Sequence, residues 1–251
     1  MNRRKGEHLS TLRRDDGSAF VSLRADLARC VGAMRSAPLL VVFTVLIFGV
    51  TNYLGLAGDA SHGAAHAWLN VAWWALQPVA LGFLGTQRAW FRDAFRGEKL
   101  RADEATPLTL GYMRRFVELA VLLTIPMVPV AVVATSMDRH SRPGPILVAA
   151  YAILLDATLT FAVPALALTT TSAWQALGIG RRMITTTWPT CAWYVLLPGV
   201  TFASLVFVLP ESSTVRVVNL IGALLFPVIA LWFKGAILAF YLRHSLPAST
   251  A

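Results

Sequence analysis

Six long apolar segments dominate this sequence of 251 residues. Each has roughly the 20 residues that an α-helix needs to cross about 30 Å of hydrocarbon at about 1.5 Å per residue. Hydrophobic residues make up 56% of the chain and charged residues only 14%, which is too apolar for an ordinary soluble domain. The sequence therefore predicts an all-α, polytopic membrane protein with six transmembrane helices. The predicted spans are approximately 38–57, 67–87, 116–137, 145–171, 190–209 and 217–242.

The basic residues are distributed unequally between the two sets of segments that connect these spans. Eighteen of the 22 Lys and Arg residues lie before span one, between spans two and three, between spans four and five, or after span six. Only three lie in the opposite loops. Because cytoplasmic loops are enriched in Lys and Arg, we predict a bacterial cytoplasmic (inner) membrane protein with both termini in the cytoplasm. The net charge of +9 then follows from topology, and no nucleic-acid partner is expected.

Three short amphipathic stretches accompany the spans on this predicted cytoplasmic side. Residues 18–35 lead into span one, residues 88–96 continue span two, and residues 172–188 precede span five. Each combines apolar residues at helical spacing with arginines on another face, a pattern typical of helices that lie at the membrane interface. The sequence thus predicts three cytoplasmic interfacial amphipathic helices. In the first, the predicted apolar stripe is Phe20, Leu23, Leu27, Val31 and Met34.

A single membrane domain is predicted to extend over residues 18–243. The preceding residues 1–17 are charged and lack hydrophobic periodicity, which is typical of a disordered segment. Residues 244–251 are expected to form a short C-terminal tail. The chain is therefore predicted to consist of a basic N-terminal segment, one membrane domain and this tail.

Eight arginines next to the membrane are expected to bind anionic lipid headgroups, each contributing about 1 kcal/mol near the surface. An acidic protein partner, or a second copy of the chain, is the alternative ligand for the same basic surface. In the second stretch, three of these arginines share one helical face at a spacing of four residues. The eight are Arg35, Arg88, Arg92, Arg96, Arg114, Arg115, Arg181 and Arg182.

Four polar side chains fall within the predicted spans, where burying a charge in hydrocarbon is costly. Asp156 lies roughly 16 Å deep in span four, and Gln77 lies at about the same depth in span two. A protonated Asp156 hydrogen-bonded to Gln77 would form an interhelical contact, whereas an ionised Asp156 in a wet cavity would suggest a proton or cation site. Glu118 and Lys234 form a second pair by depth, either as an ion pair or with Lys234 extended to the interface.

The predicted external loops contain nitrogen and carboxylate groups of the kind that bind zinc. They are Asp59, His62, His66 and His140. We favour solvated loops over a metal site, because the segment around His62 is not convincingly helical and there is no HExxH motif. Walker A, GxGxxG and GxSxG motifs are also missing from the sequence. The sequence therefore predicts no catalytic residue, no metal and no cofactor.

The last two-fifths of the chain contain a short motif pattern. Residues 161–165 read Phe-Ala-Val-Pro-Ala, residues 173–177 read Ala-Trp-Gln-Ala-Leu, and Arg181-Arg182 follow before a tryptophan-rich start of span five. Over residues 150–240 the chain resembles a loose group of bacterial six-helix integral membrane families of mostly unknown function. This group includes the membrane domain fused to some glycerophosphodiester phosphodiesterases. The resemblance implies a helical membrane domain and no catalytic residues.

Three functional hypotheses remain, and their order follows from the lack of a recognisable set of catalytic residues. The sequence favours a non-enzymatic scaffold or accessory subunit of a transport or envelope system. The alternative is a transporter or channel with Asp156 as its intramembrane polar centre. A membrane-embedded enzyme that acts on lipid comes third.

Overall fold

The computed structural model describes residues 19–59, 61–98, 101–136, 143–208 and 215–245, and all regular elements in these ranges are helical. The all-α prediction is confirmed for this part of the chain. The predicted segment 1–17 lies outside it, as do residues 246–251 of the predicted tail 244–251, whose first two residues instead end α10. The elements are α2 (Ala19–Ser36), α3 (Pro38–Thr44), the π-helical η2 (Val45–Gly49), α4 (Val50–Asp59), α5 (Gly63–Phe95), the 3₁₀ turn η3 (Ala102–Glu104), α6 (Ala105–Ser136), α7 (Pro143–Leu168), α8 (Ala173–Thr187), α9 (Ala192–Val208) and α10 (Val215–Ser245).

Three described segments are long and apolar enough to cross a membrane, namely Pro38–Gly58, Gly63–Phe95 and Leu225–Ser245. A shorter apolar helix covers Ile153–Leu168. Large apolar side chains on the outside of the molecule are strongly exposed, among them Trp68 at 74%. Exposed apolar surface on this scale is suited to lipid rather than to water. The structure is thus consistent with a membrane protein, and the full count of six spans stays a prediction.

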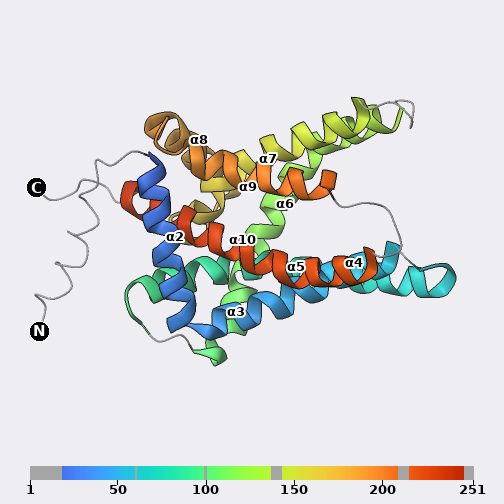
Figure 1. Ribbon diagram of the computed structural model, residues 1–251, viewed down its shortest axis with the longest axis horizontal. Coiled ribbons are helices and arrows are strands. Elements are labelled where there is room, and N and C mark those ends of the chain that lie inside the picture. The colour runs from blue at the N-terminus through green and yellow to red at the C-terminus, as the bar shows by residue number, and fades with distance from the viewer. Residues whose placement is uncertain (1–18, 60, 99–100, 137–142, 209–214, 246–251) are drawn as a thin grey trace, which may run out of the picture.

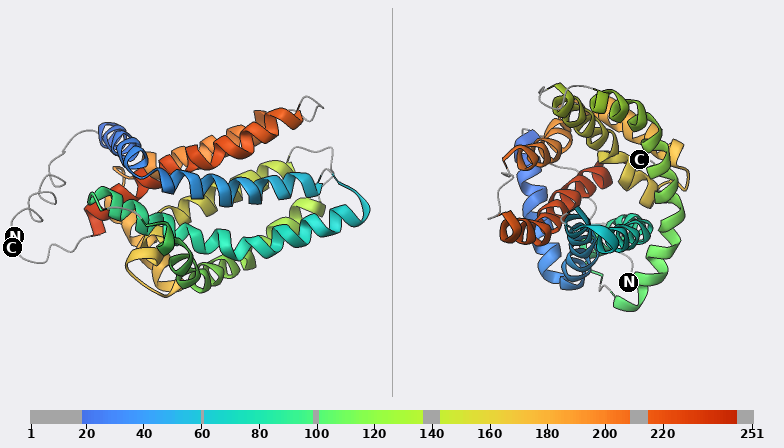
Figure 2. Two further views of the ribbon diagram at one scale, coloured as in Figure 1. Left: turned by 90° about the horizontal axis from the view of Figure 1, so that it is seen from below. Right: turned by 90° about the vertical axis from the view of Figure 1, so that its right-hand side faces the viewer.

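Successive long helices run in opposite directions between the two ends of the molecule (Figures 1 and 2). One end carries α2, the connection between α5 and α6, α8 and the C-terminal part of α10 (Figure 1). The connection between α4 and α5 lies at the other end. All three amphipathic stretches named above therefore lie at one end of the molecule. The second of them is the last part of α5 rather than a separate helix.

Local sequence explains where the helices at this end begin and stop. Pro38 is in the first turn of α3, where its missing N–H would have no intrahelical partner. Helix α5 ends at Phe95, and Gly97 follows with a φ of 74°, a left-handed conformation that glycine adopts without steric cost. In the described residues 101–104, the turn η3 then precedes α6.

Helix α2 packs against protein along a different stripe from the one that its hydrophobic periodicity predicts. It contacts α5, α9 and α10, and Phe20 at its start is 59% exposed. The approach to α10 is close, since a Cβ atom placed on Gly235 would lie 2.8 Å from Cys30 Sγ. The buried stripe of α2 therefore includes small and polar residues that the apolar pattern omits. It consists of Ser22, Leu23, Asp26, Cys30 and Ala33, and Leu27 and Met34 of the predicted stripe pack partly buried beside it.

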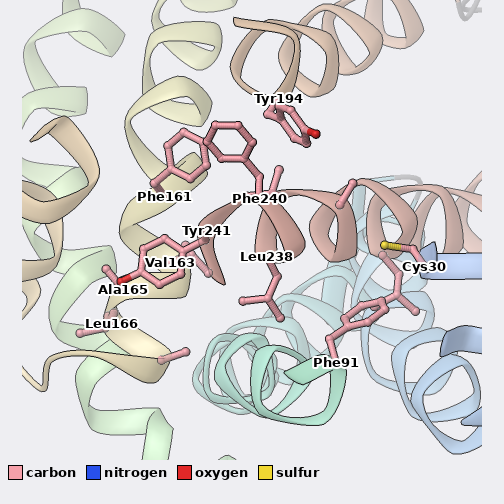
Figure 3. Packing of buried hydrophobic residues seen from close by; sticks show 14 of the residues in the cluster. Cys30, Phe91, Phe161, Val163, Ala165, Leu166, Tyr194, Leu238, Phe240 and Tyr241 are labelled. Atoms are coloured by element: carbon pink, nitrogen blue, oxygen red, sulfur yellow. The ribbon is translucent and has the colours of Figure 1, made fainter. Parts of the chain in front are cut away.

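The aromatic core lies where α7, α9 and α10 meet, towards the end that carries α2 and α8. Phe240 packs between Phe161 and Tyr194, with ring centroids 5.4 Å and 4.5 Å away (Figure 3). Cys30 of α2 and Phe91 of α5 complete the same packed region on its other side (Figure 3). By contrast, the parts of α5, α6 and α7 nearer the opposite end expose many of their apolar side chains. The protein thus has one tightly packed end.

Helices α7 and α8 approach each other so closely at Gly180 that alanine is not tolerated there. A Cβ atom on Gly180 would lie 2.8 Å from the backbone nitrogen of Ala162, whereas a Cβ atom on Gly178 would meet nothing within 4 Å. We expect Gly180→Ala to cost about 1–3 kcal/mol through overpacking. Gly178→Ala is the matched control and should be neutral or slightly stabilising, because alanine is the better helix former. Melting temperatures in a mild detergent measure both, and equal shifts would contradict the packing described here.

Candidate functional site

Three ionisable side chains from three long helices lie within electrostatic range inside the bundle, and no two of them form an ion pair among the described residues. Arg88 is on α5, Lys234 on α10 and Asp156 on α7, and each of these helices contacts the other two. Lys234 interacts electrostatically with both Arg88 and Asp156. We call these three residues the interior charge cluster. It contains two bases and one acid, so its formal charge is positive.

Arg88 is the most deeply buried member of the cluster. Only 3% of its surface is exposed, and its Nε and Nη1 atoms have no hydrogen-bond partner among the residues that the structure describes. The neighbouring Gln87 has its own contact, donating from Nε2 to Thr44 Oγ1 at 2.9 Å. The prediction that Arg88 binds lipid headgroups alongside Arg92 and Arg96 is therefore not supported, since Arg88 lies in the core. Hydrophobic residues flank all three arginines, so the sequence cannot show which one is buried.

Lys234 and Asp156 occupy the other side of the cluster, and both side chains are partly buried. Lys234 Nζ lies 4.7 Å from the centroid of the Phe48 ring, a favourable position for a cation. Asp156 faces α9 at Gly199, where a Cβ atom would lie 3.5 Å from Asp156 Oδ2. The glycine leaves room for the carboxyl group between α7 and α9.

Neither Asp156 nor Glu118 forms an ion pair with Lys234 in the described ranges. Lys234 lies within electrostatic range of Asp156, whereas Glu118 on α6 is exposed. Gln77 is partly buried on α5, and none of the side-chain hydrogen bonds in the same ranges joins it to Asp156. Residue depth can be estimated from the sequence, but rotation about each helix axis cannot, and rotation decides which side chains meet.

An apolar groove lies beside the cluster, between α5, α6 and α7. Its volume is about 230 Å³, and Thr124 is the only polar residue among those that line it. Leu155 and Leu159 of α7, which lie one and three residues from Asp156 in the sequence, line the groove. We call this cavity the α5–α7 groove. Its other lining residues include Leu81, Leu84, Phe116 and Leu123.

A second buried polar network, which the sequence did not reveal, connects α2 to α9 and α10. Tyr194 Oη donates a hydrogen bond to Asp26 Oδ2 at 2.6 Å, and Arg243 Nη2 donates to the same oxygen. Asp26 is only 2% exposed. Burial raises the pKa of Asp26 above its ordinary value, while Arg243 and Tyr194 act in the opposite direction. The network fixes α2 on the bundle and lies outside the charge cluster.

The other predicted headgroup-binding arginines lie near the packed end, and most are accessible. Arg92 forms an ion pair with Asp93 at 2.9 Å, and the Arg115 guanidinium lies 5.6 Å from the centre of the Tyr112 ring. These contacts leave Arg92 and Arg115 partly exposed. The remaining five are all exposed, namely Arg35, Arg96, Arg114, Arg181 and Arg182.

The histidine cluster considered as a metal site is only partly described. Helix α5 begins at Gly63, so His62 precedes the helix and the two imidazoles of His62 and His66 do not share a helical face. His66 Nδ1 instead lies 2.7 Å from the carbonyl oxygen of Gly58. His140 and the side chain of Asp59 lie outside the described residues. Within the described ranges, no three His, Cys, Asp or Glu side chains group together as metal ligands.

The chemistry available in the interior is therefore charge recognition. Arg88 offers two buried donors, Lys234 offers a second positive charge, and Asp156 can balance one of the two. An apolar groove adjoins these charges. No protein-family model, curated protein or solved structure matches this chain.

Proposed function

We propose that this protein is an integral protein of the bacterial cytoplasmic membrane that moves a charged solute through its interior. The observation that carries the proposal is the interior charge cluster, in which Arg88, Lys234 and Asp156 come together from three long helices. Charged side chains inside membrane helices are costly, and those that persist usually mark ion or substrate pathways. The cluster is thus the polar centre of a transporter or channel.

The composition of the cluster favours transport over a scaffold role. A structural ion pair needs one acid and one base, and it leaves no charged donor unused. Here there are two bases for one acid, and two nitrogens of Arg88 have no partner in the described part of the chain. A scaffold or accessory subunit, the hypothesis favoured by the sequence alone, does not need an excess base or unpartnered Arg88 nitrogens. Binding of a charged solute would use both.

The proposed topology has six spans and cytoplasmic termini. It is supported by three helices of sufficient length and apolarity, by the asymmetry of Lys and Arg and by the position of α2 and α8 at one end of the molecule. In this orientation the accessible arginines of that end contact anionic headgroups. The resemblance over residues 150–240 suggests the same class of membrane domain.

Charge movement in proteoliposomes tests the transport proposal. Purified protein is reconstituted, and currents are recorded after jumps in proton, potassium, chloride, acetate or decanesulfonate concentration. We expect at least one of these solutes to move charge above the protein-free background. Lys234→Met and Asp156→Asn should each reduce that current about tenfold or more, because each removes a charge that has little water to replace it.

Glu118→Gln is the matched control, because Glu118 is an exposed acid that lies outside the cluster. Its current should equal that of the wild-type protein. Two results would overturn the transport proposal and favour the scaffold role. One is a current that is indistinguishable from background for all five solutes, and the other is a current that neither cluster variant reduces.

A further inference from the structure

We propose that the interior charge cluster and the α5–α7 groove form one binding site for a single-chain anionic amphiphile of the fatty-acid type. The carboxylate contacts Arg88, and the alkyl chain occupies the groove. This inference rests on the proposed function in that it names the solute class of the same site. It also assigns a role to the α5–α7 groove, because the movement of a charge alone would not need an apolar groove.

The charge of the cluster specifies an anion. By residue type the cluster has two bases, Arg88 and Lys234, and one acid, Asp156, so its formal charge is balanced by one further negative charge. The Nε and Nη1 donors of Arg88 are buried and without partners among the described residues. An unmade hydrogen bond from a buried charged group is expensive. A ligand carboxylate would satisfy these donors, since guanidinium groups bind carboxylates through charge-assisted hydrogen bonds.

The position of Arg88 relative to the groove specifies an amphiphile. Leu81, Leu84 and Arg88 follow one another at spacings of three and four residues, so they share one face of α5. The face that lines the groove therefore continues, one turn further along α5, to the unpartnered guanidinium. On α7, by contrast, Asp156 faces α9 at Gly199 and does not line the groove. The charged and apolar surfaces therefore meet along α5.

The size of the groove specifies a single chain. An engineered apolar cavity of about 150 Å³ binds benzene, and the α5–α7 groove measures about 230 Å³. This space suits a length of one alkyl chain and is too small for the two chains of a phospholipid. Its lining is apolar apart from Thr124, so a free inorganic anion would gain nothing from it.

Photolabelling of the purified protein in dodecyl maltoside tests the inference. The probe is palmitate with a diazirine in its alkyl chain, and labelled peptides are identified by mass spectrometry. Hexadecyltrimethylammonium with the same diazirine is the comparison probe, since it has a similar alkyl chain and a cationic head that accepts no hydrogen bond. We expect palmitate to label the parts of α5, α6 and α7 that line the groove, and unlabelled palmitate to compete.

Two variants and one control make the test specific. Arg88→Met should reduce labelling of the groove by palmitate about tenfold, the effect of losing one hydrogen bond to a charged group. Ala120→Phe should reduce it by blocking the groove, because Ala120 lines it. Arg92→Met is the matched control, one turn further along α5, where Arg92 is paired with Asp93. It should label like the wild-type protein.

Arg88→Met also has a readout that a structural role would not produce. Replacing an unpaired buried charge by an apolar residue of similar length is often stabilising. We therefore expect this variant to melt at a higher temperature than the wild-type protein without ligand, and to lose the rise in melting temperature that palmitate causes. A variant that melts lower and still responds to palmitate would overturn the assignment of Arg88.

The remaining outcomes separate this inference from the proposed function. Equal labelling by both probes would show nonspecific hydrophobic binding, and stabilisation by acetate or phosphate as strong as that by palmitate would show a small-anion site. Either result overturns the amphiphile site while cluster-dependent currents still support transport. Conversely, Arg88-dependent palmitate labelling without any current supports the site and removes the transport proposal.

Discussion

Asp26→Ala is expected to destabilise the protein by about 3–5 kcal/mol, the cost of removing one partner from a buried ion pair. Asp26 Oδ2 accepts hydrogen bonds from both Tyr194 and Arg243, and it is almost fully buried. Its removal leaves the Arg243 guanidinium, which is only 15% exposed, without its acid. Unfolding by heat and by denaturant in mild detergent measures the loss.

The individual partners should contribute unequally. Arg243→Met is expected to cost less than Asp26→Ala, because burial already raises the pKa of Asp26. The carboxyl group can then take up a proton and keep its hydrogen bond to Tyr194. Tyr194→Phe removes that bond, at about 1.5–3 kcal/mol for a bond to a charged group, together with the long 3.5 Å hydrogen bond that Arg243 Nη2 donates to Tyr194 Oη. In the double variant of Asp26 and Arg243 the losses should be far from additive.

Asp93→Ala is the matched control for this network. Asp93 also forms an ion pair with an arginine, but the pair with Arg92 is near the surface, with side-chain exposures of 35% and 22%. Such pairs contribute about 0–1 kcal/mol. Hydrogen exchange adds a local readout, since Asp26→Ala should expose the amides of α2 before those of α5. Equal losses of unfolding free energy for Asp26→Ala and Asp93→Ala would show that the buried network contributes no more than a surface ion pair.

The sequence predicts the helices far better than it predicts their faces. Each predicted span corresponds to a long helix or a continuous run of helical elements, because apolar length and the breaks near Pro38 and Gly97 are local properties. The stripe of α2 differs from the prediction for a physical reason. Its partners are protein helices that approach closely, so Cys30 and Ala33 are buried where lipid contact would favour larger apolar residues.

Two residues of the interior charge cluster can be recognised in the sequence as charges within a span, and the third, Arg88, cannot. Charge within an apolar run is unusual, so the sequence indicates Asp156 and Lys234, and the structure places them within electrostatic range of each other. Arg88 was grouped with the exposed arginines because α5 continues beyond the apolar run without a break. The sequence does contain one indication that Asp26 is buried. It is the acid within an otherwise basic helix, and it lies three residues after Leu23 and four before Cys30. Its partners on α9 and α10 cannot be predicted from this spacing.

Phe240→Ala should be the other strongly destabilising variant, at about 3–5 kcal/mol. Phe240 is fully buried where α7, α9 and α10 meet, and its ring packs against Phe161 and Tyr194 (Figure 3). It also stacks on His244. Van der Waals packing of this kind holds helices together in a membrane, where the hydrophobic effect contributes little between them. Truncation removes these contacts and leaves a cavity.

The cavity should persist, because the surrounding helices are held by other contacts. Thr169 and Tyr241 hydroxyls are 2.6 Å apart between α7 and α10, and Trp232 Nε1 donates to the Leu27 carbonyl oxygen at 2.7 Å between α10 and α2. A rigid apolar cavity binds small aromatic molecules. Benzene should therefore raise the melting temperature of Phe240→Ala and leave that of the wild-type protein unchanged.

Phe20→Ala is the matched control, because Phe20 is a phenylalanine with 59% of its surface exposed and an edge contact to Trp193. Its loss should stay near the 0.5–1.5 kcal/mol that one aromatic pair contributes. A cost for Phe240→Ala as small as that for Phe20→Ala would mean that the three helices do not depend on this core. Benzene rescue without a large loss would point instead to a cavity already present in the wild-type protein.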